Sequence, residues 1–366
     1  MRLVAAVLIG IVLFSGCAQE EEVTVSSTIP ENALEPVTVP QKEEATVSST
    51  LPEETTIEPT ILRGTPDSDF SVEVYKPDKA YAGTTLLPDN HNPGKPRVIE
   101  VNMLGEIVWE YVLPSNLRQY TNPGFDVELL SDDNIMFVLP RKGVYEINRE
   151  GGVVWSYLDE KVSHDADRLS NGNTLVVFGN NDKMADAQVK EVSPDGTIVW
   201  SWHAKDHFSE EYKDISNQGW THTNAVTRLE NGNTLISPRN FDMLVEVDSQ
   251  GSVVRTIGRD YLKKQHDPEI LGNGNILLAN HGTPHEVLEI NPETDEIVWR
   301  FPMSSRKTQP VRDANRLPNG NTLITGSTVI LEVTPDKEIV WKLNLKEGMF
   351  KPEESAERGF YKAERI

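Results

Sequence analysis

Short apolar segments separated by glycine turns recur along most of the chain. One unit begins with D-A-D-R-L at Asp165 to Leu169, turns at N-G-N, and continues with a second apolar segment from Thr174. Asn-Gly between apolar runs is a strong hairpin signal, because tight primed turns need positive φ at both central residues. A third segment, a D-G turn and a segment ending in I-V-W complete the unit. This pattern predicts one four-stranded antiparallel meander per unit.

The units end on a recurring aromatic residue. It occurs at Trp109, Trp155, Trp200, Trp299 and Trp341, with Arg255 in its place in one unit. Successive positions in this series lie 42 to 55 residues apart. This is the typical length of one blade of a β-propeller. We therefore expect the tryptophans to belong to the core of the blades.

The first unit lacks a proper strand in front of A-G-T-T-L-L at Ala82. We expect the missing strand at the other end of the chain, where K-A-E-R-I at Lys362 to Ile366 matches D-A-D-R-L. The sequence thus predicts an all-β fold. It is a six-bladed β-propeller of four-stranded antiparallel blades over residues 61–366, closed by the C-terminal strand.

Residues 1–16 have the pattern of a signal peptide, in which an apolar run too short to span a bilayer follows Arg2. Ser15 and Gly16 precede Cys17, the single cysteine, as in a lipoprotein processing site. Residues 17–60, rich in Ser, Thr, Pro and Glu, predict a disordered tether. We expect an exported protein, lipid-anchored at Cys17 to the cell membrane and facing the outside or the periplasm. A plain cleaved signal with a leftover cysteine is the alternative.

The net charge and the absence of several motifs exclude some classes of partner and enzyme. A formal net charge of −22 argues against nucleic acid as a partner. The sequence contains no Walker-type phosphate loop, no G-x-G-x-x-G and no G-x-S-x-G, and no internal transmembrane helix is predicted. The absence of a nucleotide loop is consistent with a reaction that uses no nucleotide.

One structurally equivalent position occurs in every blade, but the type of residue that occupies it varies. Counting back five residues from the Leu or Ile that ends each innermost strand gives Tyr361, Phe125, His164, Asn224, His266 and Arg312. Packing alone would not choose His, Asn and Arg, so we expect this ring to face the central channel.

Hairpin geometry adds further residues at the same mouth of the channel. Eight residues after the first Asn of the turn are Arg239 in the fourth blade and His281 in the fifth. His222 lies two residues before Asn224 and therefore on the same side of its strand. The long connection before His222 is expected to form a partial lid, with Trp220 over the mouth. Its two histidines, His203 and His207, are too few ligands for a metal site.

Three segments of the chain resemble the arylsulfate sulfotransferase family of six-bladed propellers. They are V-S-H-D-A-D-R-L at Val162, W-T-H-T-N-A-V at Trp220 continuing to S-P-R-N at Ser237, and Q-H-D-P-E-I-L at Gln265. The resemblance implies that His266 is the nucleophile, that His164, His222 and Arg239 surround the sulfuryl group, and that Asn224 lies beside them. The better-known members carry an extra N-terminal β-domain and a disulfide, which this chain lacks.

The resemblance implies transfer of a sulfuryl group from a small aryl sulfate donor to a phenolic acceptor, without a nucleotide, cofactor or metal. A neutral imidazole can displace the phenolate and form a sulfohistidine, which a second phenol resolves in a ping-pong cycle. Arg239, with Arg312, would hold the sulfuryl oxygens, and one of His164 or His222 would do the same or protonate the leaving phenolate. His281 and Trp220 are further candidate substrate contacts.

Two other functions stay open on the sequence alone. The cluster of His and Arg residues is also compatible with a cell-surface propeller that binds a sulfated or anionic aromatic ligand without turnover. A tethered propeller can equally be a scaffold in an envelope assembly, because propellers serve all these purposes.

Overall fold

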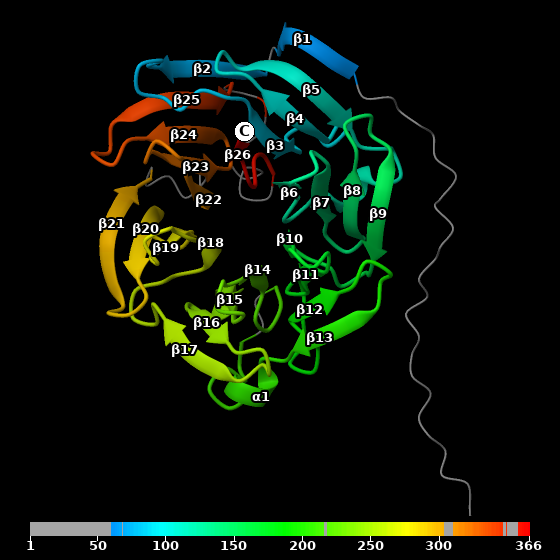
Figure 1. The fold of residues 1–366 in the computed structure, drawn as a ribbon, viewed down its shortest axis with the longest axis vertical. Coiled ribbons are helices and arrows are strands. Elements are labelled where there is room, and N and C mark those ends of the chain that lie inside the picture. Colours follow the sequence, from blue (N-terminus) through cyan, green and yellow to red (C-terminus); the bar gives the residue numbers. More distant parts are fainter. Residues whose placement is uncertain (1–59, 68, 216–217, 304–309, 347–348, 350–357) are drawn as a thin grey trace, which may run out of the picture. The chain divides into compact units, whose positions relative to one another are not determined.

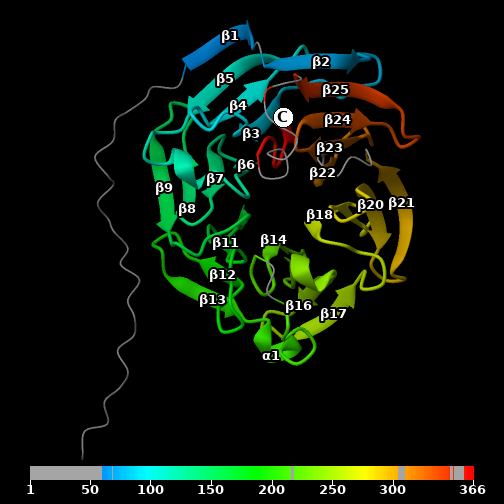
Figure 2. The ribbon, with the colours of Figure 1, turned by 180° about the vertical axis from the view of Figure 1, so that it is seen from behind.

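The computed structural model describes residues 60–67, 69–215, 218–303, 310–346, 349 and 358–366, which lie within one compact unit, Val47–Ile366. The predicted signal peptide, Cys17 and nearly all of the predicted tether lie outside the described residues. Six antiparallel sheets surround a common axis (Figure 1), and the same ring is seen from behind in Figure 2. The predicted six-bladed β-propeller is therefore confirmed.

Each blade runs from an innermost strand at the axis to an outer strand at the rim. Blade 1 contains β26 (Glu364–Arg365), β3 (Thr85–Asp89), β4 (Arg97–Val101), β5 (Glu106–Val112) and β1 (Thr60–Pro66). Blade 2 contains β6 (Asp126–Leu129), β7 (Ile135–Leu139), β8 (Gly143–Ile147) and β9 (Val153–Leu158). Blade 3 contains β10 (Ala166–Arg168), β11 (Thr174–Val177), β12 (Val189–Val192) and β13 (Ile198–Trp202).

The second half of the ring follows the same plan. Blade 4 contains β14 (Thr223–Arg228), β15 (Thr234–Pro238), β16 (Leu244–Val247) and β17 (Val253–Ile257). Blade 5 contains β18 (Gln265–Ile270), β19 (Ile276–Asn280), β20 (Glu286–Asn291) and β21 (Glu296–Pro302). Blade 6 contains β22 (Val311–Arg316), β23 (Thr322–Gly326), β24 (Val329–Val333), β25 (Ile339–Leu345) and β2 (Phe70–Tyr75). The described helices are short: α1 (Lys205–Phe208), η1 (Arg118–Tyr120) and η2 (Arg239–Phe241).

The C-terminal strand closes the ring as expected. In β26, Glu364 pairs with Leu86 and Arg365 with Thr85 of β3, so the end of the chain completes the inner edge of blade 1. Two outer strands were missed by the sequence interpretation. β1 pairs with β5 of blade 1, and β2 pairs with β25 of blade 6, so these two blades have five strands. One N-terminal segment therefore crosses the seam between the first and last blades.

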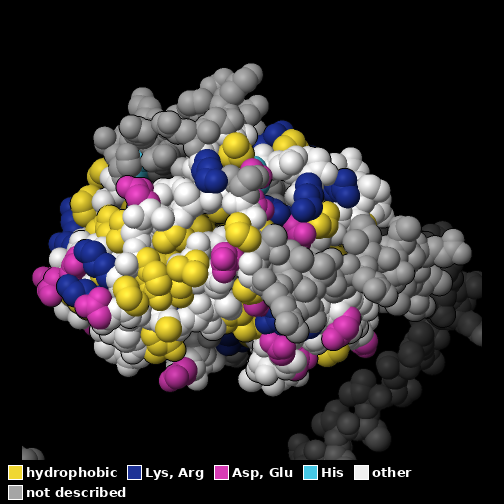
Figure 3. Space-filling model, turned by 90° about the horizontal axis from the view of Figure 1, so that it is seen from above, with side chains coloured by type: hydrophobic (Ala, Val, Ile, Leu, Met, Phe, Trp, Pro, Cys, Tyr) yellow, Lys and Arg dark blue, Asp and Glu magenta, His cyan; other side chains and the backbone are white. Residues whose placement is uncertain are grey.

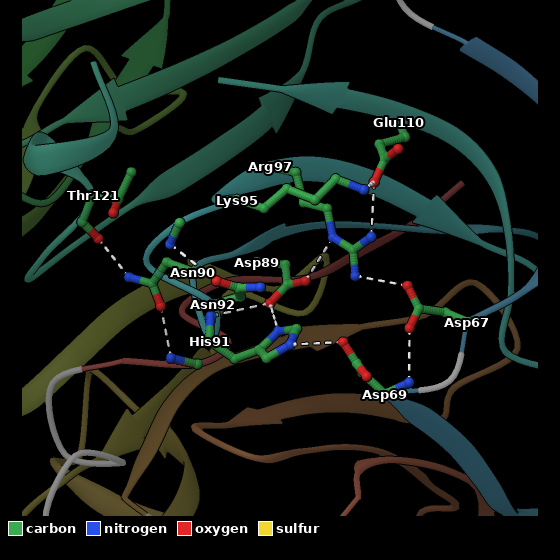
Figure 4. A network of polar contacts seen from close by, with 12 residues as sticks. Asp67, Asp69, Asp89, Asn90, His91, Asn92, Lys95, Arg97, Glu110 and Thr121 are labelled. Carbon is green, nitrogen blue, oxygen red and sulfur yellow. Dashed lines mark hydrogen bonds and ion pairs between the residues drawn. The ribbon is translucent and has the colours of Figure 1, made fainter. Parts of the chain in front are cut away.

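A polar network fixes this crossing segment to blade 1 (Figure 4). Arg97 donates to Asp67 at 2.8 Å and to Asp89 at 2.9 Å. His91 lies between two carboxylates, with Nδ1 2.5 Å from Asp89 Oδ1 and Nε2 3.1 Å from Asp69 Oδ2. Because Asp67 and Asp69 lie between β1 and β2, these contacts hold the outer strands in place.

A repeated contact joins neighbouring blades. Trp155 Nε1 donates to the carbonyl of Pro194 in the next blade at 2.9 Å, while the Arg168 guanidinium lies 4.9 Å from the centre of its ring. Arg168 also pairs with Glu146 at 2.7 Å. Where Arg255 replaces the tryptophan, its Nη1 donates to the carbonyl of Pro292 at 3.1 Å and so keeps the contact. At four of the tryptophans and at Arg255, the recurring position therefore joins adjacent blades.

The surface visible in Figure 3 carries charges of both signs. On the face shown in Figure 3, acidic and basic side chains are interspersed around hydrophobic ones, without a continuous basic patch. No helix in the described part of the chain is long and apolar enough to cross a membrane.

Candidate active site

The inner strands share a local irregularity at the ring position. Bulges fall at Asn224, between Thr223 and Ala225 of β14, and at Arg312, between Val311 and Asp313 of β22. In blade 3, Val177 accepts from the Ser163 N–H and donates to the Asp165 carbonyl, which leaves His164 out of the ladder. In blade 5 the register shifts directly after His266. A bulge re-aims a side chain, and in this propeller an irregularity at or directly after the ring position recurs in blades 3, 4, 5 and 6.

Four histidines gather at one end of the inner strands. The ring centroids of His164 and His222 are 4.7 Å apart, and those of His266 and His281 are 4.6 Å apart and nearly parallel. Tyr361 lies between the two pairs, with centroid distances of 6.0 Å to His164 and 6.3 Å to His266. The residues predicted from blade spacing therefore come from blades 3, 4 and 5 to one place.

Two buried arginines belong to the same cluster. Arg239, at the start of η2, is 8% exposed, and its Nε and Nη1 have no hydrogen-bond partner among the described residues. Arg312 is 5% exposed, lies 5.7 Å from the centre of the Tyr361 ring and donates to the carbonyl of Phe360. Burial lowers the pKa of Arg312 to about 10, so it still carries its charge at neutral pH. A buried guanidinium with unused donors is suited to an anionic group.

The histidines of the cluster are neutral at pH 7. Burial, reinforced by the positive charges of Arg239 and Arg312, lowers the pKa of His164 and His281 well below the usual value. Burial, then His281 and Arg239, do the same for His266. Burial and Arg239 lower the pKa of His222 to about 3. A neutral imidazole keeps one nitrogen lone pair for attack or for accepting a hydrogen bond.

The hydrogen bonds of each ring show which nitrogen holds the proton. His266 Nδ1 lies 2.9 Å from the Lys264 carbonyl, and His222 Nδ1 lies 2.8 Å from the Gln218 carbonyl. A carbonyl only accepts, so both rings carry the proton on Nδ1 and the lone pair on Nε2.

His164 has the opposite arrangement. Its Nδ1 is 2.7 Å from Ser163 Oγ, which accepts from the Gly179 N–H. The alternative acceptor for the Ser163 hydroxyl, the Thr223 carbonyl, is 3.5 Å away. The hydroxyl therefore donates to Nδ1, and Nε2 of His164 carries the proton.

The backbone around His222 is fixed by a buried carboxylate. Asp182 accepts from the N–H of His222 at 3.1 Å and from the hydroxyl of Thr221 at 2.9 Å. His222 has φ 47°, a left-handed conformation that non-glycine residues seldom adopt without such support.

Three predicted positions lie elsewhere or act differently. Trp220 does not lean over the mouth, because its indole packs against Phe241 in a hydrophobic cluster and donates to the Tyr212 carbonyl. Phe125 is buried against Phe137 in the core. Asn224 donates from Nδ2 to the Gln265 carbonyl at 2.8 Å, so it links blades 4 and 5, and its Oδ1 has no partner among the described residues.

Sequence reasoning missed Tyr361 as a site residue although it had placed Tyr361 in the ring. It also missed the carboxyls that follow the ring position, whose signal was the repeated Asp of segments such as H-D-A-D and R-D-A-N. In the described part of the chain, no three His, Cys, Asp or Glu side chains are arranged to hold a metal ion.

Known proteins resemble this chain at the level of family and of fold. The model of the arylsulfotransferase (ASST) family matches residues 71–260. No curated protein matches the chain.

Solved structures share the fold at low sequence identity. A protein of unknown function from Bacteroides caccae has a TM-score of 0.56 and 17% identity, over 77% of this chain and 98% of that one. A streptogramin B lyase has a TM-score of 0.49 and 13% identity, over 76% and 89% of the two chains. Identities this low show the fold alone. The family match spans more than half of the sequence and includes the segments that carry His164, His222 and Arg239. The chain therefore belongs to the arylsulfotransferase (ASST) family.

Proposed function

We propose that this protein transfers a sulfuryl group from an aryl sulfate to a phenolic acceptor, with His266 as the nucleophile. The observation that carries the proposal is the pairing of two features in one cluster. His266 has its Nδ1 proton fixed on the Lys264 carbonyl, which leaves Nε2 as the free lone pair. Arg239 adds buried N–H donors that have no partner among the described residues.

The first half-reaction exchanges one bond for another. Nε2 of His266 attacks sulfur, the N–S bond forms, and the S–O bond to the aryl group breaks with its electron pair on the phenolate. The Nε2 proton of His164 and the donors of Arg239 bind the sulfuryl oxygens and stabilise the charge that develops on them. Arg312 adds a second positive charge to the site.

The second half-reaction runs the same chemistry in reverse. An acceptor phenol attacks the sulfur of the sulfohistidine, and His266 leaves as the neutral imidazole. Nε2 of His222, which carries a lone pair, accepts a hydrogen bond from the acceptor hydroxyl and orients it.

The test is phenol release from p-nitrophenyl sulfate, with and without an added phenol, by the wild type and His266→Ala. We expect acceptor-dependent release by the wild type and none above background by the variant, because the nucleophile is gone. His207→Ala, at an exposed histidine outside the cluster, is the matched control and should keep full activity. Binding of aryl sulfate by the folded wild type without any phenol release would contradict the proposal and favour a binding propeller.

We also propose that the propeller is exported and held at a membrane through a lipid on Cys17. The support is the sequence pattern of residues 1–16 and the single cysteine directly after it. Recovery of the full-length protein in the soluble fraction of its native cells would contradict this arrangement.

A further inference from the structure

The residue after each ring position forms a second layer, one step deeper along the inner strands. These positions hold Asp126, Asp165, Ala225, Asp267, Asp313 and Lys362. We call Asp126, Asp165, Asp267 and Asp313 the carboxyl layer. Asp126 and Asp165 are 3% exposed and Asp313 is 1% exposed, and Asp165 and Asp313 directly follow His164 and Arg312 of the cluster in the chain.

The carboxyl layer has more acid groups than its positive charge can balance. Lys362 Nζ lies 3.6 Å from Asp267 Oδ2 and 3.9 Å from Asp126 Oδ1. Within the described residues no other cation makes an ion pair with the layer. One ammonium cannot neutralise four crowded carboxylates, so some of them keep a proton. In agreement, burial raises the pKa of Asp126, Asp165 and Asp313 well above the usual value.

A purely structural role does not account for these acids. Asp165 Oδ2 accepts from the Val226 N–H at 2.7 Å, and Asp313 Oδ2 accepts from the Ala363 N–H at 3.1 Å. Each of these contacts between blades uses one oxygen, as an asparagine would. The other oxygen, Oδ1, is buried without a partner among the described residues in both. Blade 4 has Ala225 at the same position, so blade closure does not require a carboxyl.

Tyr361 is a ring-position residue and precedes Lys362 of the second layer in the chain. Its ring contacts His164 and His266. Burial, followed by the charges of Asp126 and Asp267, raises the pKa of Tyr361 well above the usual value, so its hydroxyl keeps the proton. A hydroxyl both donates and accepts, and can therefore pass a proton from one side to the other.

A ping-pong cycle needs a proton that the neutral histidines cannot supply. The departing phenolate takes up a proton in the first half-reaction, and the acceptor phenol returns one in the second. A neutral imidazole that gave up its proton would become an imidazolate. The proton must come from another group or from solvent.

We propose that the carboxyl layer stores the proton of the ping-pong cycle and that the Tyr361 hydroxyl passes it to and from the sulfuryl site. This inference rests on the proposed sulfuryl transfer. When the S–O bond breaks, Tyr361 gives its proton to the phenolate oxygen and takes one from the layer, which gains a negative charge beside Lys362. When the acceptor phenol attacks sulfur, its proton returns by the same route.

The experiment counts protons in a single turnover. Excess full-length protein is mixed with phenyl sulfate near pH 7 in weak buffer, without acceptor, and phenol release is recorded together with a pH indicator. Phenol, with a pKa of about 10, leaves in its protonated form at this pH. We expect phenol release without proton uptake from solvent in the wild type. Uptake of about one proton per phenol by the wild type would overturn the proposal.

Two variants distinguish proton storage in the carboxyl layer from the sulfuryl transfer itself. Asp165→Asn/Asp313→Asn keeps the backbone contacts but removes two stored protons, and Tyr361→Phe keeps the ring but removes the link. Each should take up about one proton per phenol released, and an unchanged count in both would also overturn the proposal. Asp336→Asn, at an exposed turn between β24 and β25 and outside the layer, is the matched control and should leave the count unchanged. If the wild type releases no phenol at all, the proposed function itself fails.

Discussion

At the scale of single residues, Arg239 is the most informative side chain of the site. Its guanidinium is buried, and Nε and Nη1 point to no acceptor within the described residues. Leaving buried N–H donors unused costs about 1–3 kcal/mol each in a folded protein. Such a cost persists where the donors serve a ligand, and an oxyanion is the ligand that a guanidinium matches best.

We therefore expect Arg239→Lys to lower kcat/KM for aryl sulfate by about 10²–10³-fold, as for loss of one oxyanion donor. Lysine keeps the charge but loses the planar fork that holds two oxygens. Steady-state kinetics with p-nitrophenyl sulfate measure the effect, and thermal unfolding checks the fold. Arg255→Lys, at an interface between blades, is the control and should change stability more than activity. An unchanged kcat/KM for Arg239→Lys would remove Arg239 from the site.

At the scale of elements, the crossing segment with β1 and β2 depends on the ionisation of His91. Burial favours the neutral ring, but the hydrogen bonds to Asp89 and Asp69 raise the pKa of His91 above its usual value. A group whose pKa is raised on folding stabilises the protein fully below its unfolded pKa, about 6.5, and stops doing so as pH rises through the folded pKa. The attachment of the outer strands is thus strongest on the acid side of neutrality.

We expect His91→Gln to lower the free energy of unfolding by about 1.5–3 kcal/mol at pH 6, the range for hydrogen bonds to charged groups. The loss should shrink as pH rises through the folded pKa of His91, because the ring then becomes neutral in both states. Denaturant unfolding at several pH values measures the difference in free energy of unfolding between the variant and the wild type. The buried neutral histidines are the same in both proteins, so their effects cancel in this difference. The exposed His207→Gln is the control. A difference that grew with rising pH would contradict the assignment of His91 as the charged partner.

The same scale shows what the sequence could predict. The four inner strands of each blade follow from alternation and Asn-Gly turns, because both are local signals. β1 and β2 could not be found this way, since each pairs with a strand distant in sequence and β1 contains Gly64 and Pro66. Counting along the blades found His164 and His266 at equivalent positions, and hairpin geometry added His222 and Arg239, because the blades share one order of strands. Trp220 was misplaced because its hydrophobic partner Phe241 comes from another segment.

At the scale of the whole molecule, both described ends of the propeller close the same seam, and we expect the fold to form without the residues before Thr60. β26 completes the inner edge of blade 1, while β1 and β2 cover the outer edges of blades 1 and 6. The network of Asp67, His91 and Arg97 (Figure 4) joins the segment between β1 and β2 to blade 1, and it uses no residue of the predicted tether. Attachment to a membrane and the chemistry of the propeller should therefore be separable.

We expect a fragment beginning at Thr60 to match the full-length protein in melting temperature and in phenol release, but to leave the membrane fraction. Cys17→Ser in the full chain should also lose the membrane fraction, because a lipid on Cys17 is the proposed anchor and its buried CH₂ groups would supply the membrane affinity. Fractionation and metabolic labelling with a fatty acid measure both effects, and Ser15→Ala, which keeps a small residue ahead of Cys17, is the control. Membrane retention of Cys17→Ser with unchanged labelling would contradict the anchor, and a fragment that melts far below the full chain would show that the tether contributes to the fold.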